Sequence, residues 1–215
     1  MVRRLLLVAF LVGIAQSATA QIIDAGGSGR RFGQPNAWAS LGIGWLQQGG
    51  LCDPGSNSCW DFGNAMQWRG TLEYPMGRGA TIGAAATTAR VPLTYIQTLG
   101  CPSGCDADAN VSQYLAQLHL GGGTGIQQAI DIAAGMTVFT NFRSKDTGIR
   151  LDPAKAVSNF SFSVAYGFAL PIKSNFHLTL SQEYGQIIGK RMSGRSSNSA
   201  QQNITRIGAR VGLGL

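Results

Sequence analysis

Apolar and polar side chains alternate with a period of two residues along most of this sequence. In the segment 160–170, Phe, Val, Tyr and Leu fill the even positions, while Ser, Ala and Gly fill the odd positions. Such alternation is typical of β-strands whose two faces meet different surroundings. Similar segments, some of them weaker, occur at 37–47, 66–74, 80–95, 113–122, 131–142, 176–184 and 206–215. The pattern therefore predicts eight strands.

The segment 80–95 is irregular, because its apolar residues change from even to odd positions. Ile82 and Ala84 belong to the even set, whereas Leu93 and Tyr95 belong to the odd set, and Pro92 lies near the change. Proline cannot donate a ladder hydrogen bond, and a bulge reverses the faces of a strand. We therefore expect a bulge or an edge-like break at Pro92.

The connections between the predicted strands differ in length. Two are short, 75–79 and 171–175, and the connection 123–130 is of moderate length. The other four are longer, at 48–63, 96–112, 143–157 and 186–202. Long and short connections alternate, so the sequence predicts an up-and-down meander with long loops at one end and tight turns at the other.

The N-terminus has the features of a secretory signal peptide. Arg3 and Arg4 precede an apolar run from Leu5 to Ala15, and small residues follow up to Ala20. Eleven apolar residues are too few to cross a bilayer as a helix, so we expect cleavage. The expected organisation is a signal peptide at 1–20, a flexible periplasmic lead-in at 21–35 and a β-barrel at 36–215. The mature protein would enter an oxidising compartment.

The composition narrows the class of protein. Of the 215 residues, 44% are hydrophobic and only 13% are charged, and the net charge is +7, or +5 without the two leader arginines. Soluble domains carry about 25% charged residues. No apolar run approaches the roughly 20 residues of a membrane-spanning helix. These values disfavour a disordered chain, a helical membrane protein and a coiled coil, and in this compartment we expect no nucleic-acid partner.

The orientation of the apolar face decides between two barrel types. A soluble lipocalin-like barrel turns its apolar face inward. An eight-stranded lumen is only wide enough for side chains to fill, so rows of Phe and Tyr would overfill it. We therefore expect these rows to face lipid, with small and ionisable residues inside. Candidates for the interfacial aromatic girdles, of which we expect about a third to lie elsewhere, are Trp38, Trp45, Trp68, Tyr74, Tyr95, Tyr114, Tyr166 and Tyr184.

The signal peptide, the eight strands and the alternating loops resemble the small bacterial outer-membrane barrels of the OmpA/OmpX type over residues 36–215. The resemblance implies an eight-stranded antiparallel up-and-down transmembrane β-barrel in the bacterial outer membrane. The segment from Ile207 to Leu215 resembles the C-terminal signal that the outer-membrane assembly machinery reads, although Leu215 stands where the family usually has Phe or Trp. No peptidoglycan-binding domain follows, so we do not expect a wall-tethering role.

Five ionisable residues share the predicted inner face: Arg69, Glu73, Glu183, Arg206 and Arg210. Unpaired buried charges are costly, so the arginines and glutamates should meet in charge-assisted hydrogen bonds. Three arginines against two glutamates would leave one positive charge in the lumen. The family resemblance suggests that such a network plugs or gates the lumen, and we favour a structural plug over a regulated pore.

The four cysteines form two close pairs, Cys52 with Cys59 and Cys101 with Cys105. We expect two local disulfides, because the compartment is oxidising and the spacings are not those of a zinc ribbon. Zinc binding and a pairing between the two loops are the alternatives. His119 and His177 are isolated, so we expect satisfied lumen side chains, and no metal or cofactor.

The chain lacks the features of a barrel-borne enzyme. Neither histidine lies in a long loop, and no G-x-S-x-G motif is present, so we expect no catalytic residues. The last two long loops contain more basic than acidic residues. The acidic residues are Asp146 and Asp152, and the basic residues are Arg143, Lys145, Arg150, Lys155, Lys190, Arg191 and Arg195. They form either a basic rim that binds lipopolysaccharide or ordinary solvated loops.

The sequence thus predicts an outer-membrane barrel with a structural or surface-interaction role. Its expected partners are outer-membrane lipid, lipopolysaccharide, the assembly machinery, and host or environmental surface ligands that meet the loops. A narrow pore for small solutes is the alternative, and an enzyme is the least favoured hypothesis.

Overall fold

The computed structural model describes residues 35–77, 79–97, 101–122, 125–190 and 198–214. The expected signal peptide, the lead-in up to residue 34, and Leu215 lie outside these residues. No helix in the described part is long and apolar enough to cross a membrane. The strands are β1 (Ala37–Gln48), β2 (Leu51–Asp53), β3 (Ser58–Phe62), β4 (Ala65–Gly77), β5 (Ala80–Gln97), β6 (Cys101–Gly122), β7 (Gln127–Ser144), β8 (Val157–Lys173), β9 (Phe176–Ile188) and β10 (Ser199–Leu213).

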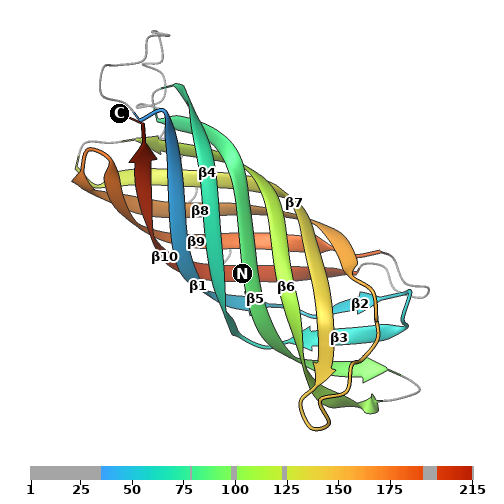
Figure 1. The fold of residues 1–215 in the computed structure, drawn as a ribbon. Coiled ribbons are helices and arrows are strands. Elements are labelled where there is room, and N and C mark those ends of the chain that lie inside the picture. Colours follow the sequence, from blue (N-terminus) through green and yellow to red (C-terminus); the bar gives the residue numbers. More distant parts are fainter. Residues whose placement is uncertain (1–34, 78, 98–100, 123–124, 191–197, 215) are drawn as a thin grey trace, which may run out of the picture.

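Eight of these strands close into an antiparallel barrel (Figure 1). Neighbouring strands follow the order β1, β4, β5, β6, β7, β8, β9, β10, and β10 pairs again with β1 from Gln202↔Gln48 to Leu213↔Ala37. Each strand pairs with its successor along the chain except where the short strands β2 and β3 intervene. The predicted eight-stranded, up-and-down transmembrane barrel is confirmed. Closure leaves no unpaired strand edge within the membrane.

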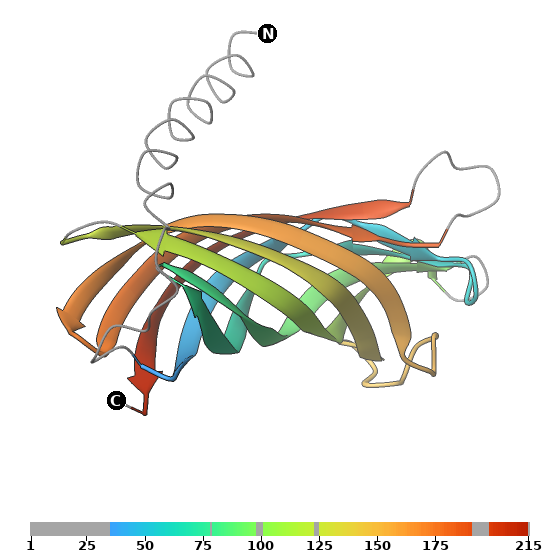
Figure 2. The same cartoon turned by 90° about the horizontal axis from the view of Figure 1, so that it is seen from above.

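The two ends of the barrel differ. The end that carries the β4–β5, β6–β7 and β8–β9 connections, with the beginning of β1 and the end of β10, is called the turn end below. The opposite end is called the loop end, and it carries the β2–β3 hairpin and the connections after β7 and β9. Figure 2 shows the hairpin and the C-terminus at opposite ends of the barrel.

The expected long loops are shorter than the sequence predicted, because regular structure continues into them. The first contains the β2–β3 hairpin, and β3 pairs with β5 from Ser58↔Gln97 to Phe62↔Leu93, in line with β4. The second is almost entirely strand, since β5 ends at Gln97 and β6 begins at Cys101. The apolar residues that β6 turns inward here are small alanines, which explains the weak signal in the sequence.

The β5–β6 ladder has no bulge at Pro92, but the expected edge-like break is present on the other side of β5, where pairing with β4 ends at Ala89 and pairing with β3 begins at Leu93. The β5–β6 register runs without interruption through Pro92↔Asp108. Odd-numbered side chains of β5 face inward on both sides of the proline, from Thr81 to Tyr95. The backbone keeps its alternation, so what changes is the environment of each face.

The outer surface of the barrel carries a belt of exposed large apolar side chains. On β8, Phe160, Phe162 and Val164 are exposed, whereas Ser161 and Ser163 between them are buried. Soluble monomers rarely expose apolar patches larger than a few hundred Å². The belt includes Leu41, Trp45, Trp68, Leu72, Ile82, Ile132, Met136, Phe160, Phe162, Val164, Phe168, Leu170, Leu178, Leu180, Ile207 and Val211. The prediction that the bulky apolar face points outward is confirmed in this part of the barrel.

Two of the eight girdle candidates lie inside the barrel instead. Trp38 shares the inward parity of Gly42 and Gly44 on β1, and Tyr95 is fully buried opposite Trp60. The other six lie on the outer face: Trp45, Trp68, Tyr74, Tyr114, Tyr166 and Tyr184. The sequence did not separate these groups, because an aromatic residue fits both a lipid interface and a protein core.

Candidate functional site in the barrel lumen

The middle of the lumen holds an ion triad of Glu183 and two arginines. Arg69 Nη1 donates to Glu183 Oε2 at 2.9 Å, and Arg206 Nη1 donates to the same oxygen at 2.6 Å. β10 lies between β9 and β1, and β1 pairs with β4, so closure of the barrel brings the three side chains together. All three residues are more than 90% buried. A carboxylate that accepts two charge-assisted hydrogen bonds ties three strands of the wall to one point.

A second ion pair lies nearer the turn end. Arg210 Nη2 donates to Glu73 Oε2 at 2.6 Å, and the hydroxyl of Thr81 donates to the same oxygen at 2.5 Å. The Arg210 guanidinium lies over the ring of Trp38, 4.5 Å from its centroid. The inward position of Trp38 therefore has a physical reason, since its ring stacks on a buried cation. His177 also packs against Trp38, and the centroids of the two rings lie 5.0 Å apart.

The structure adds residues that the sequence reasoning missed. Arg69 Nη2 donates to Gln117 Oε1 at 2.7 Å, and Gln117 Nε2 donates to Asp131 Oδ1 at 3.1 Å. His119 Nδ1 lies 2.6 Å from the same Asp131 oxygen. With Asp131, the network holds three carboxylates beside its three arginines, so the excess positive charge expected from the five predicted residues has an acidic counterpart. The odd position of Asp131, shared with inward Ala133 and Thr137, was the signal that could have identified it.

Above the ion triad, towards the loop end, glutamines extend the hydrogen-bonded network. Arg206 Nη2 donates to Gln67 Oε1 at 2.7 Å. Gln113 Nε2 donates to Thr137 Oγ1 at 3.0 Å and to Gln202 Oε1 at 2.9 Å. Gln202 Nε2 in turn donates to Gln48 Oε1 at 3.1 Å. These amides span the lumen between the charged groups and an apolar region beyond them.

Small residues on the inner wall make room for the long side chains. A Cβ added to Gly42 would lie 3.1 Å from Arg206 Cδ, so a larger residue there would press on the arginine. Two cavities lie among the side chains of the lumen. A cavity of about 70 Å³ lies between the ion triad and the Glu73–Arg210 pair, and one of about 270 Å³ opens at the turn end beside Trp38 and His177.

An aromatic cluster of Trp60, Phe62, Phe139 and Phe142 fills the lumen at the loop end. Trp60 lies 4.5 Å from Phe142 and 5.4 Å from Phe139 between ring centroids, and Phe62 stacks on Phe139 at 5.4 Å. Aliphatic neighbours, including Leu46, Leu51 and Val91, complete a continuous buried core. The expectation that only small and ionic groups line the interior therefore fails in this region, where apolar side chains face inward.

A bulge in β7 directs the second of two nearby rings, that of Phe142, into the lumen beside Phe139. Phe139 and Phe142 are three residues apart, so regular alternation would place them on opposite faces. Asn141 adopts φ +56°, and the β6–β7 register shifts between Asp108 and Asn110. Asparagine tolerates this left-handed conformation better than most residues. The bulge restores the inward direction at Phe142, which is fully buried.

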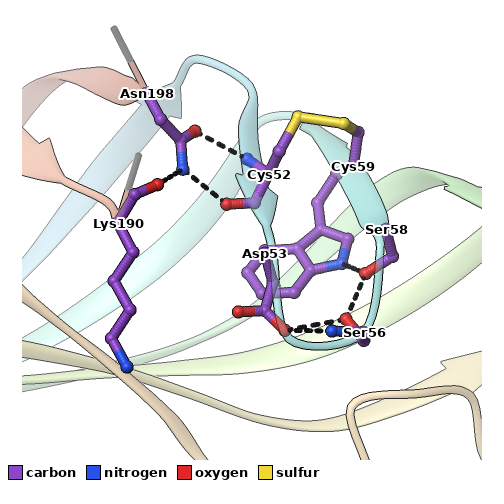
Figure 3. Close-up of a disulfide and its surroundings, with 8 residues drawn as sticks. Cys52, Asp53, Ser56, Ser58, Cys59, Lys190 and Asn198 are labelled. Carbon is purple, nitrogen blue, oxygen red and sulfur yellow. Dashed lines mark hydrogen bonds between the residues drawn. A yellow bond between two sulfur atoms is a disulfide. The ribbon is translucent and has the colours of Figure 1, made fainter. Parts of the chain in front are cut away.

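Two disulfide bonds join Cys52 to Cys59 and Cys101 to Cys105. The first connects directly opposed residues of β2 and β3, and the second connects two residues of β6. Figure 3 shows the first bond beside Asn198, whose side-chain amide bonds to both backbone groups of Cys52. No group of residues suited to hold a metal ion occurs within the described ranges.

Charges of both signs surround the loop end. Asp108 accepts a hydrogen bond from Arg90 at 3.0 Å and lies 3.6 Å from Lys145. Arg150 donates to the carbonyl of Ala154, and Arg143 donates to the side chain of Asn141. Of the other predicted rim residues, Lys155 and Lys190 are exposed, whereas Arg191 and Arg195 lie outside the described residues. Of the predicted rim residues, Lys145 thus has an acidic neighbour, whereas Arg143 and Arg150 bond to neutral oxygens.

Comparisons with known proteins support the fold. No protein-family model and no curated protein matches the sequence. Among solved structures, Neisserial surface protein A, from Neisseria, aligns over 83% of this chain and 97% of its own, with a TM-score of 0.58 and 10% identity. AlkL in lipid bilayers aligns over 88% and 95%, with a TM-score of 0.49 and 12% identity. Ail of Yersinia pestis aligns over 81% and 99%, with a TM-score of 0.41 and 15% identity.

At such low identity the likeness concerns the fold alone. The fold is that of a small eight-stranded membrane barrel, and the apolar belt provides the lipid-facing surface that such a barrel needs. Closed up-and-down barrels with an outward apolar band are the spanning structures of the bacterial outer membrane. This chain is accordingly an outer-membrane protein.

Proposed function

We propose that this protein is a non-conducting outer-membrane barrel that presents its loop end at the cell surface and has a structural or surface-interaction role. Outer-membrane barrels have short periplasmic turns and longer external loops, which supports placing the loop end outside. The two disulfides lie at that end, where the environment is oxidising.

The observation that carries the proposal is the double obstruction of the lumen. The aromatic cluster obstructs the loop end, and the ion triad with its glutamines obstructs the middle. An ion would have to displace Trp60 and Phe142, which touch ring to ring, and then separate Glu183 from two arginines. Breaking a buried ion pair costs roughly 3–5 kcal/mol, so we expect no steady conduction.

Planar-bilayer recording tests the proposal directly. The refolded protein, verified by its heat-modifiable migration on gels, should give no discrete single-channel steps. A variant that weakens both obstructions, Trp60→Ala with Phe142→Ala, Glu183→Gln and Arg206→Gln, should give steps and shows that the assay can detect an open lumen. The lipid-facing pair Phe160→Ala with Phe162→Ala is the matched control and should stay silent. Regular steps from the unmodified protein would overturn the proposal.

A narrow pore is the second candidate, because the lumen has cavities on the turn-end side. The 270 Å³ cavity reaches Arg210 and His119, and the 70 Å³ cavity continues to Arg69 and Arg206. The same recordings separate the two functions. If a pore is present, Glu183→Gln should change its conductance or its charge selectivity.

The proposed partners are outer-membrane lipid, lipopolysaccharide, surface ligands of the loops and the assembly machinery. Arg90 lies on the outer face of β5, on the loop-end side of the belt residue Ile82. This level suits contact with lipopolysaccharide phosphates. Arg90→Gln should weaken binding of lipopolysaccharide micelles, and Lys173→Gln at the turn end is the control. Equal binding by both variants would exclude this contact.

We further propose that the barrel is not an enzyme. The sequence supports this, because it has no G-x-S-x-G motif to supply a nucleophile to the Asp131-bound His119 or to His177, which packs on Trp38. Lipid-hydrolysis and peptidase assays on the folded protein should show no turnover above buffer.

A further inference from the structure

β2 is the most weakly anchored strand at the loop end. It contributes three residue pairs, all with β3, and it ends the strand order on that side. The side chain of Asn198 takes the place of a neighbouring strand: its Oδ1 accepts from the Cys52 N–H at 2.9 Å, and its Nδ2 donates to the Cys52 carbonyl at 2.6 Å (Figure 3). A second bond from Nδ2 reaches the Lys190 carbonyl at 2.7 Å. The Cys52–Cys59 bond is a covalent cross-link between β2 and its strand partner β3.

The same short strand helps to cover the aromatic cluster. Leu51 of β2 pairs with Trp60 of β3, and both side chains are almost completely buried in the core of the loop end. The Trp60 indole N–H donates to Ser58 Oγ at 2.9 Å, and Ser58 lies opposite Asp53. Cys59 is next to Trp60 along β3 and points to the opposite face. The disulfide therefore braces, from outside, the cross-strand pair that closes the lumen inside.

A groove on the outer side gives solvent access to this disulfide. Its volume is about 230 Å³, and its lining includes Cys52, Cys59, Asp61, Ile96 and Asn198. Cys59 is partly exposed, whereas Cys52 is 6% exposed. A small thiolate entering the groove would therefore meet the Cys59 sulfur first.

We propose that the Cys52–Cys59 disulfide is a thiol-exchange site at which a small dithiol releases β2 and uncovers Trp60. The incoming thiolate attacks Cys59 Sγ, the S–S bond breaks, and Cys52 leaves as a thiolate that takes up a proton. The second thiol of the reagent then attacks the reagent's first sulfur, which is bonded to Cys59 in the mixed disulfide. The reagent closes into a disulfide, and Cys59 is released as a thiol. Overall, one dithiol is oxidised to a disulfide while the protein gains two thiols.

The groove also favours certain thiols by charge. Asp61 is exposed and lines the groove, so its carboxylate attracts cationic thiols and repels anionic ones. At contact distance, opposite charges attract and like charges repel even in water. The site should therefore react about tenfold faster with a cationic aminothiol than with an anionic sulfonated thiol of similar size, after correction for their thiolate fractions. Salt should reduce this preference.

The experiment treats the folded barrel in lipid vesicles with dithiothreitol and follows thiol release by mass spectrometry after alkylation. Cys52 and Cys59 should become alkylated while the barrel stays folded on unboiled gels. Hydrogen–deuterium exchange should then rise at least tenfold in peptides covering 51–62, with little change in β8. The variant C52S/C59S should show this fast exchange without any reagent, whereas C101S/C105S should resemble the untreated protein until it is reduced.

Several results would overturn the proposal. One is a Cys52–Cys59 bond that resists dithiothreitol until the barrel is unfolded, and another is unchanged exchange of 51–62 after reduction or in C52S/C59S. Equal rates for the cationic and the anionic thiol, or a preference that survives Asp61→Asn, would refute the role of Asp61. The inference goes beyond the proposed function, because it holds whether or not the lumen conducts, and bilayer recordings test conduction separately.

Discussion

The turn-end half and the loop-end half of this barrel use the same strands with opposite distributions of side chains. On β5, the outward residue near the turn end is Ile82 and the inward residue is Thr87; near the loop end, Thr94 points outward and Tyr95 inward. The first half is apolar outside and polar inside, as lipid requires. The second is apolar inside and polar outside, like a soluble β-barrel. The same continuous strand therefore presents an apolar outer face to lipid and a polar outer face to water.

This inversion explains both obstructions of the lumen. Where lipid surrounds the wall, the outer face takes the bulky apolar residues, and the interior takes glycine, serine and the ion triad. Where water surrounds the wall, the apolar residues turn inward, and Trp60 with Phe142 forms a conventional core. The surroundings of each level of the barrel therefore decide which face is apolar, while the backbone alternation stays the same.

The largest expected effect comes from breaking the ion triad. Glu183→Gln leaves Arg69 and Arg206 without their shared carboxylate, so the free energy of unfolding should fall by about 3–5 kcal/mol. Urea titration of the protein in lipid vesicles measures this loss. The control is Tyr184→Phe, the outward neighbour on β9, which should change stability by less than about 0.5 kcal/mol. Equal effects of the two variants would mean that the triad contributes nothing.

A truncation in the aromatic cluster should cost nearly as much. Phe142→Ala removes a fully buried ring in contact with Trp60, and such substitutions cost about 3–5 kcal/mol because a cavity remains. The same urea titration measures the cost, and near-ultraviolet circular dichroism should report the loosened tryptophan. If stability is unchanged, the loop end is not a packed core.

Introducing charge on the outer face distinguishes the two halves. Val164→Arg places a cation in the middle of the apolar row of β8 and should cost about 2–4 kcal/mol. Gln201→Arg, on the outer face of β10 near the loop end, should change stability by less than about 0.5 kcal/mol. Stability and the yield of folded barrel on unboiled gels are the measurements. Similar costs at both positions would contradict the inversion.

The smallest effect is expected at the exposed ion pairs. Asp108→Asn weakens contacts with Arg90 and Lys145, both well exposed, and should cost no more than about 1 kcal/mol at low salt. Adding salt should reduce the difference further, because water and ions screen these charges. The test is a pair of urea titrations at low and high salt. A cost comparable with that of Glu183→Gln would show that this pair is structurally essential.

The sequence predicted a strand and its two faces best where each face has the same surroundings along the whole strand. In 160–170 the alternation was complete, because lipid contacts the even positions and the narrow lumen contacts the odd ones. It predicted less well in 96–112, where Ala107 and Ala109 are buried but small, and near Pro92, where a change of solvent resembled a change of backbone. Asp131 and the glutamines were missed, since their role depends on partners across the lumen.

The sequence by itself determined the number of barrel strands, the membrane-facing rows and the small and ionisable residues that line the lumen within the membrane, because alternation and composition are local properties of the chain. Only the tertiary structure decided that Arg69 and Arg206 share one carboxylate, that Trp38 stacks on Arg210, and that β2 and β3 hold Trp60 in the loop end. The contacts of Arg69 with Glu183 and of Trp38 with Arg210 join residues more than a hundred positions apart, and barrel closure sets their register. The contact of Trp60 with Phe142 depends on the bulge at Asn141.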